Sequence, residues 1–155
     1  MKILSIDPGS NLGYAKFKSR NNFVSGELTT NPKQSQLGRM CHLWDQMQVL
    51  FSEFEPNVLV IEDVLKAAYG LKHYNALFWL IVTYTCAVLT AYRRQMRIVN
   101  VPPSQLKKTI TGKGNAKKEQ ILSAINDLTG LNLKKNKHNQ ADAIGLGLTF
   151  FEIGG

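Results

Sequence analysis

Cysteine is scarce in this chain, and its shortage excludes two classes of small protein. Only Cys41 and Cys86 occur among the 155 residues, far apart in the sequence. They form no C-x-x-C pair and no spacing typical of a zinc site, so neither a disulfide scaffold nor a zinc finger fits. We expect two reduced, buried thiols, as is common in cytosolic proteins.

Acidic residues are outnumbered, with 11 Asp and Glu against 19 Lys and Arg, which gives a formal net charge of +8. This surplus favours a polyanionic partner, with nucleic acid the first choice and an anionic membrane surface the second. The sequence shows no repeats, no low-complexity tract and no evident linker. We therefore expect a single domain over residues 1–155, long enough to bury a core.

The N-terminus lacks the pattern of an export signal, because its first apolar run soon meets Asp7. Residues 74–92, by contrast, carry no charge and are long enough to span a membrane. The Asn, Thr and Tyr residues in this stretch, and its place between two predicted strands, favour a helix buried in a core or a dimer interface. We expect a cytoplasmic protein with no membrane segment.

Apolar patterning predicts five strands. Residues 2–7, 12–18 and 22–29 are expected to form an antiparallel meander, with a polar turn before the third strand. Residues 57–63 form a continuous apolar run typical of a strand covered on both faces, and 97–101 predict one more strand. Three meandering strands followed by strands that alternate with helices predict an α/β fold: a five-stranded mixed sheet flanked by helices on both faces.

Helical spacing predicts the covering helices. We expect helices near 34–54, 72–92, 104–110 and 138–152, and an amphipathic helix that Gly130 ends. A glycine- and lysine-rich loop, "TGKGNAKK", precedes this amphipathic helix. The apolar stripes of two helices are expected in the core, through Leu37, Met40, Leu43, Trp44, Met47, Leu50, Phe51 and Phe54 in the first and Ile121, Leu122, Ile125 and Leu128 in the amphipathic one.

Two predicted core strands each end in an acid. Asp7 shares a face of its strand with Ile3 and Ser5, and Glu62 closes the strand that begins at residue 57. Ligand sites of open α/β sheets gather at the carboxyl ends of such strands. The two carboxylates are therefore expected at one edge of the sheet, within reach of a shared metal ion.

A third acid, Asp142, lies in the last predicted helix among alanines and glycines. Glycine costs about 1 kcal/mol relative to alanine inside a helix, so its presence indicates a face packed closely against the sheet. A buried carboxylate needs a partner, and a cation shared with the two strand acids would supply one. His138 and Asn139 precede Asp142 by four and three residues, so both share its helix face.

Each acid has a simpler explanation when it is taken alone. Asp7 precedes Pro-Gly and could start a turn, Glu62 could be a surface acid, and Asp142 could pair with a lysine. Taken together, the ordered set favours an all-oxygen site for Mg²⁺ or Mn²⁺. Two such ions can hydrolyse a phosphodiester, and the basic remainder of the chain would hold the nucleic-acid backbone.

With these residues established, the sequence resembles the RuvC family of Holliday-junction resolvases, within the ribonuclease H-like superfamily. The resemblance covers nearly the whole chain and rests on "ILSIDPGSNLGYA", "VLVIEDV", "PSQLKKTITGKGNAKKEQI" and "NQADAIGLGL". It implies a homodimeric, Mg²⁺-dependent endonuclease that makes paired nicks across a four-way DNA junction, with Mn²⁺ as a substitute ion. It also implies that the helix at 72–92, uncharged over 74–92, supplies much of the dimer interface.

The resemblance assigns a role to each matching residue. Asp7, Glu62 and Asp142 match the family's metal ligands, and Asn139 stands where the family usually has Asp or His, with His138 beside it as an alternative ligand. Lys118 is expected at the catalytic site as well as on DNA. The expected DNA contacts are Lys107, Lys108, Lys113, Lys117 and Lys118, together with Leu65, which stands where family members often carry a Phe, and nearby Tyr69.

Three other functions stay open at this point. One is a RuvX-like nuclease of the same superfamily that acts on RNA, against which the glycine-lysine loop argues. Another is a non-catalytic junction-binding protein, with Asn139 as the mark of a decayed site. The third is a membrane-surface protein. The residues indicate neither an accessory helicase partner nor whether the host is a bacterium or a virus.

Overall fold

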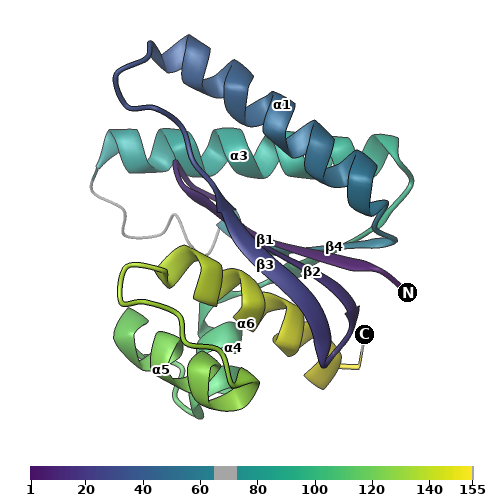
Figure 1. Ribbon diagram of the computed structural model, residues 1–155, viewed down its shortest axis with the longest axis vertical. Coiled ribbons are helices and arrows are strands. Elements are labelled where there is room, and N and C mark those ends of the chain that lie inside the picture. Colours follow the sequence, from purple (N-terminus) through teal and green to yellow (C-terminus); the bar gives the residue numbers. More distant parts are fainter. Residues whose placement is uncertain (65–72, 155) are drawn as a thin grey trace.

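The computed structural model describes residues 1–64 and 73–154, and Figure 1 shows them as a sheet between two layers of helices. The strands are β1 (Ile3–Asp7), β2 (Leu12–Ser19), β3 (Asn22–Leu28), β4 (Val58–Glu62) and β5 (Arg97–Val101). The helices are α1 (Gln36–Phe54), α3 (Tyr74–Arg93), α4 (Pro103–Thr111), α5 (Lys118–Thr129) and α6 (His138–Glu152). The elements predicted from the sequence are confirmed, with boundary differences of at most two residues.

The sheet of the described residues has the order β3-β2-β1-β4-β5. The first three strands form the predicted antiparallel meander, and β1, β4 and β5 run parallel. The pairing of Ile6 with Ile61 places Asp7 and Glu62 at the same carboxyl edge. The mixed five-stranded sheet is therefore confirmed, and β1 is its central strand.

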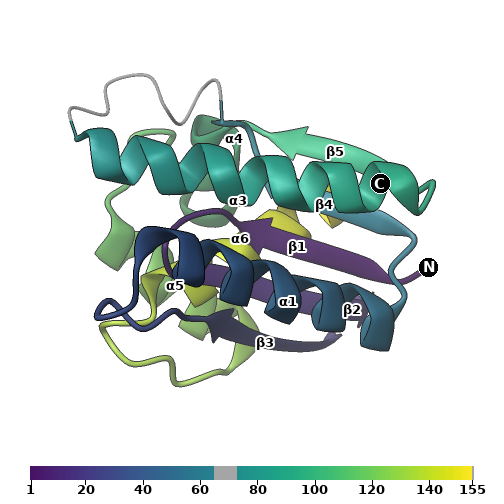
Figure 2. The ribbon, with the colours of Figure 1, turned by 90° about the horizontal axis from the view of Figure 1, so that it is seen from above.

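Alternation along the strands separates two cores. Leu4 and Ile6 of β1 face α1 and α3, which lie side by side over one face of the sheet (Figure 2). Ile3 faces α4, α5 and α6 on the other side, as do Ser5 and Asp7, which share its face of the pleat. The acids of β1 and β4 therefore point toward the layer that carries α6.

Four of the predicted core positions are wrong. Leu37 and Trp44 of α1 are 69% and 41% exposed, Leu128 of α5 is 58% exposed, and Cys41 is exposed. Helical spacing gives the direction of an apolar stripe but not the width of the surface that covers it. Trp44 follows the buried Leu43 and therefore points about 100° away from it around the helix, beyond the surface that the sheet and α3 cover.

The helix α3 has the length and composition of a membrane span, and a third of its most apolar stretch is buried. It packs against β4, β5 and α1 as one layer of the fold. A run of its apolar and aromatic side chains stays exposed on the outer face, at Tyr74, Ile81, Leu89 and Tyr92. The helix is therefore only partly buried by its own chain.

Candidate active site

The three acids singled out in the sequence line one cavity of about 390 Å³. Asp7 enters it from the end of β1, Glu62 from the end of β4 and Asp142 from the second turn of α6. The loop of residues 8–11, the start of α3 and the facing sides of α4 and α5 form the rest of the wall. Three acids remote in sequence thus reach one space at the carboxyl edge of the sheet.

Close packing of α6 against the sheet carries Asp142 to this position. The Ser5 hydroxyl on β1 donates a hydrogen bond of 2.6 Å to the carbonyl oxygen of Ala143. A Cβ atom at Gly147 would lie 2.1 Å from the Phe17 ring, so glycine is what allows the contact there. The small residues of this helix confirm the close approach that its sequence predicts.

The start of α6 is held by β3 rather than by its own residues. It has no acidic residue in its first turn and no side-chain cap. Instead Lys137 Nζ lies 2.8 Å from Glu27 Oε2, and the Gln140 amide donates to Ser25 Oγ over 2.9 Å. These contacts fix the turn that carries the candidate ligands, and no pattern in the sequence predicts them.

Burial and mutual repulsion disfavour the charged forms of the three acids. Burial, followed by the charges of Asp142 and Glu62, raises the pKa of Asp7 well above its usual value, although the charge of Lys118 lowers it. Burial and then Asp142 raise the pKa of Glu62 to about 7. Burial raises the pKa of Asp142 to about 6, while Lys118, His138 and Lys107 oppose the shift. Near neutral pH the cluster needs protons or a cation.

Two of the predicted DNA-contacting lysines line the same cavity. Lys107 comes from α4 and Lys118 from the first residue of α5, and both lower the pKa of Glu62 and of Asp142. Neither forms an ion pair with another described residue. Lys108, Lys113 and Lys117 are exposed outside the cavity wall. Lys107 and Lys118 are therefore placed to meet an anion beside the acids.

The two alternatives for a further ligand take different positions. Asn139 lines the cavity, whereas His138 does not. His138 lies close enough to Asp142 to lower the pKa of that acid, and its buried Nδ1 has no hydrogen-bond partner in the described residues. The cavity therefore favours Asn139 as the ligand and His138 as a neighbour of Asp142. Leu65 and Tyr69 lie outside the described residues.

The donor set suits a hard divalent cation. Three carboxylates and the Asn139 amide offer oxygen atoms, which Mg²⁺ and Mn²⁺ prefer. In the described part of the chain, no three Asp, Glu, His or Cys side chains are already grouped to hold an ion. Repulsion between carboxylates opposes such grouping until a cation balances it. The raised pKa values mark the positions where a cation would replace protons.

Comparison with known proteins identifies the family. Residues 3–150 match the family described as crossover junction endodeoxyribonuclease RuvC. The RuvC enzyme of Campylobacter lari is 30% identical over 96% of this chain and 94% of its own length, and that of Prochlorococcus marinus is 29% identical over 96% and 97%. The structure of Thermus thermophilus RuvC in complex with a Holliday junction substrate covers 97% of this chain and 93% of that one, with a TM-score of 0.78 at 19% identity, and confirms the ribonuclease H-like fold. The chain belongs to the RuvC family of crossover junction endodeoxyribonucleases.

Proposed function

We propose that this chain cuts four-way DNA junctions by paired nicks, as a Mg²⁺-dependent homodimer, at the cavity that Asp7, Glu62 and Asp142 share. Membership of the family makes it a structure-selective DNA endonuclease. One observation supports this site above all others: three half-buried acids from separate elements line one cavity with two lysines that form no ion pair among the described residues. Residues 1–155 would form one nuclease domain that works in the cytoplasm.

Each residue of the cavity has a distinct task in this proposal. Asp7, Glu62 and Asp142 hold Mg²⁺, for which Mn²⁺ substitutes, and Asn139 contributes a neutral oxygen. The bound cation supplies Lewis-acid stabilisation of the charge that develops on the phosphate. Lys107 and Lys118 hold the phosphodiester backbone against the acids and offset their repulsion. The rigid central strands keep the strand acids fixed, as an active site requires.

A substrate comparison tests the proposal. The chain is incubated with Mg²⁺ and either a four-way DNA junction, a linear duplex of the same sequence or a structured RNA. We expect symmetric nicks in the junction and none in the duplex. Faster cleavage of the RNA would favour the RuvX-like function. Junction binding without nicks at every Mg²⁺ and Mn²⁺ concentration would favour a non-catalytic binding protein.

The exposed side chains of α3 support the homodimer. Ile81 and Leu89 are 47% and 53% exposed on the outer face of a helix that carries no charge before Arg93. Apolar side chains that the protein's own chain leaves uncovered mark an interaction surface. In the proposed dimer this face of α3 packs against the same face of a second copy, as two-fold symmetry requires.

Charges on this face should separate the dimer. We expect Ile81→Glu/Leu89→Glu to sediment at the monomer mass of 17.4 kDa, while the unchanged chain sediments at twice that mass. Analytical ultracentrifugation gives both masses. Leu128→Glu is the matched control, because Leu128 is equally exposed but lies on α5 in the opposite layer. A monomeric unchanged chain, or a dimer that survives both charges, would contradict the prediction.

The raised pKa values predict how the stability of the metal-free chain depends on pH. Glu62 and Asp142 have folded-state pKa values of about 7 and about 6, above their unfolded values of 4.5 and 3.8. Between these limits the folded state binds more protons than the unfolded state, so the free energy of unfolding should fall as pH rises from about 4 to about 7. Saturating Mg²⁺ should remove the fall, because the cation replaces those protons.

Urea unfolding in EDTA, at half-unit steps between about pH 4.5 and 8, measures this dependence. Glu62→Gln tests the cluster, since it removes one of its acids and keeps every titratable side chain outside it. Glu62→Gln should show a flatter curve than the unchanged chain. Curves that stay parallel across this range would show that Glu62 does not titrate with a raised pKa.

A further inference from the structure

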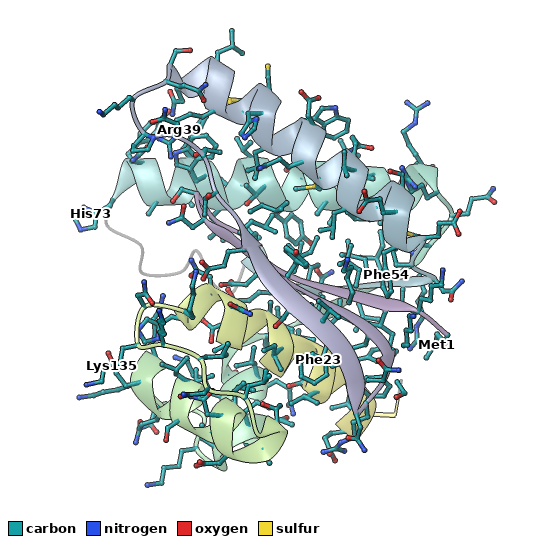
Figure 3. The ribbon with its side chains drawn as sticks, viewed as in Figure 1. Met1, Phe23, Arg39, Phe54, His73 and Lys135 are labelled. Atoms are coloured by element: carbon teal, nitrogen blue, oxygen red, sulfur yellow. The ribbon has the colours of Figure 1, made fainter. Side chains whose placement is uncertain are left out.

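Arg39 in the first turns of α1 is held in a fixed orientation by two neighbours. Its Nε donates a hydrogen bond of 2.9 Å to Thr30 Oγ1, and its Cζ lies 4.6 Å from the centroid of the Trp79 ring. Thr30 is itself buried. Figure 3 shows Arg39 at the same end of the molecule as His73 and opposite Met1 and Phe54. The carboxyl ends of β1 and β4, with the candidate active site, lie at this end.

Trp79 connects Arg39 to the active site. It is 1% exposed and contributes to the wall of the catalytic cavity. Its indole Nε1 is buried without an acceptor among the described residues. A buried donor without an acceptor destabilises the fold, and a phenylalanine at this position would not carry that cost. Tryptophan is, however, the aromatic side chain that attracts a cation most strongly through its ring face. The residue is therefore better explained as a platform for Arg39 than as simple core packing.

The outer half of the Arg39 guanidinium has no partner in the described residues. Nε is its only hydrogen-bonding atom in use, and no carboxylate of the described chain forms an ion pair with it. The two Nη groups of a guanidinium form a planar fork that fits two oxygens of one phosphate. Because stacking and the Thr30 bond already fix the side chain, little conformational entropy remains to be lost when it binds.

Arg39 and the two cavity lysines lie on opposite sides of the sheet. Lys107 and Lys118 approach from α4 and α5 on one side of the sheet, while Arg39 lies behind the α3 wall on the other. A DNA strand carries a phosphate for each step of about 3.4 Å along the helix axis. A strand that continues from the acids toward the α1 and α3 side would carry further phosphates toward Arg39.

We propose that the Arg39 fork, stacked on Trp79, binds a backbone phosphate of the same DNA strand, next to the scissile one. The contact rests on the proposed function, since it requires DNA in the cavity. It adds a binding residue behind the α3 wall, on the side of the sheet opposite Lys107 and Lys118. The DNA strand is then bound by Lys107 and Lys118 on one side of the acids and by Arg39 on the other, which fixes the position of the bond to be cut.

Binding measurements in an Asp7→Asn background test the contact without cleavage. The dissociation constant of a four-way junction is measured by fluorescence anisotropy across a salt series. Arg39→Ala should weaken binding about tenfold and lower the slope of log affinity against log salt by about one. Arg39→Lys keeps the charge, so it should keep the slope while weakening binding about threefold, since an ammonium lacks the planar fork.

Arg94→Ala is the matched control. Arg94 also stacks on a ring, with its Cζ 5.8 Å from the Phe51 centroid, but it follows the C-terminal end of α3 at the opposite edge of the sheet. Thermal unfolding of each variant verifies that it is folded, and Arg39→Lys retains the stack if Arg39→Ala does not fold. An unchanged slope in folded Arg39→Ala, or an equal loss in Arg94→Ala, would overturn the proposal.

Junctions with a single neutral methylphosphonate linkage identify the phosphate. At one position the neutral linkage should weaken binding by the unchanged Arg39 protein and have no further effect on Arg39→Ala. Additive losses at every position near the cleavage point would count against a direct contact. Nicking of the junction by the unsubstituted chain is measured separately. If the unsubstituted chain makes no nicks, the proposed function is wrong. If it makes nicks but Arg39→Ala leaves the salt slope of binding unchanged, only the Arg39 contact is wrong.

Discussion

Asp7→Asn should abolish junction cleavage, by at least about a thousandfold, while the dissociation constant of the junction stays within about twofold. Asn has nearly the same shape as Asp but no charge. Asp7 ends the central strand, and burial, followed by the charges of Asp142 and Glu62, raises its pKa well above its usual value. In the proposed function, loss of its charge removes a metal ligand from the rigid part of the site and leaves the lysines free to bind phosphate.

The same substitution should stabilise the metal-free chain. Burial and the charges of Asp142 and Glu62 raise the pKa of Asp7, so its ionised form opposes folding. An amide removes that repulsion, and the urea midpoint in EDTA should rise. Loss of activity together with a gain of stability distinguishes a metal ligand from a residue whose replacement merely damages the fold.

Two measurements test whether Asp7 is a metal ligand. One is the rate of single-turnover cleavage with saturating Mg²⁺, and the other is junction binding measured by fluorescence anisotropy. Asp127→Asn is the control, because it makes the same change of charge at an exposed position of α5 outside the cavity wall. Cleavage by Asp7→Asn at the rate of Asp127→Asn would show that Asp7 is not a ligand. Cleavage lost together with binding would show that Asp7 organises the DNA surface instead.

The strand acids were predictable because their positions depend on local rules. Alternation placed Asp7 on the face of Ser5, and the parallel pairing of β1 with β4 brought Glu62 to the same edge. The glycines around Asp142 predicted the close approach of α6 that Gly147 and Phe17 make. These inferences need only the period of a strand or a helix and a common fold rule.

Contacts that depend on strand register or on surface width were not predictable. The meander predicts that β3 pairs with β2, but only the observed register places Glu27 in one cross-strand row with Gly13 and Asp7. The stacking of Arg39 on Trp79 joins two helices that carry no pairing signal in their sequences. His138 and Asn139 share a helix face with Asp142, so only the observed cavity separates their positions.

Gly13 matters both to the fold and to the candidate site, because the absence of a Cβ atom there lets α6 pack against β2. It lies in β2 between Asp7 and Glu27 in the cross-strand row. A Cβ atom there would lie 1.9 Å from the carbonyl oxygen of Asn139 and 3.0 Å from the Gln140 nitrogen. Both of these are backbone atoms, so no side-chain rotation relieves the clash. The first turn of α6 would have to move away from the sheet.

Gly13→Ala should therefore lower the free energy of unfolding by about 3 kcal/mol or more. It should also cost most of the cleavage activity under conditions where the variant is still folded, because the displaced turn carries Asn139 and leads into Asp142. Urea unfolding and single-turnover cleavage at low temperature measure the two effects separately. A normal cleavage rate in a destabilised variant would show that α6 can shift without disturbing the acids.

Gly9→Ala provides the matched control for stability. It makes the same substitution at the same edge of the sheet, but its added Cβ would meet nothing closer than the Asn11 carbonyl oxygen at 3.7 Å. Its free energy of unfolding should stay within about 0.5 kcal/mol of the unchanged chain. Equal free energies of unfolding for Gly13→Ala and Gly9→Ala would mean that β2 or α6 can shift without loss of stability. The close packing at Gly13 would then not position the site.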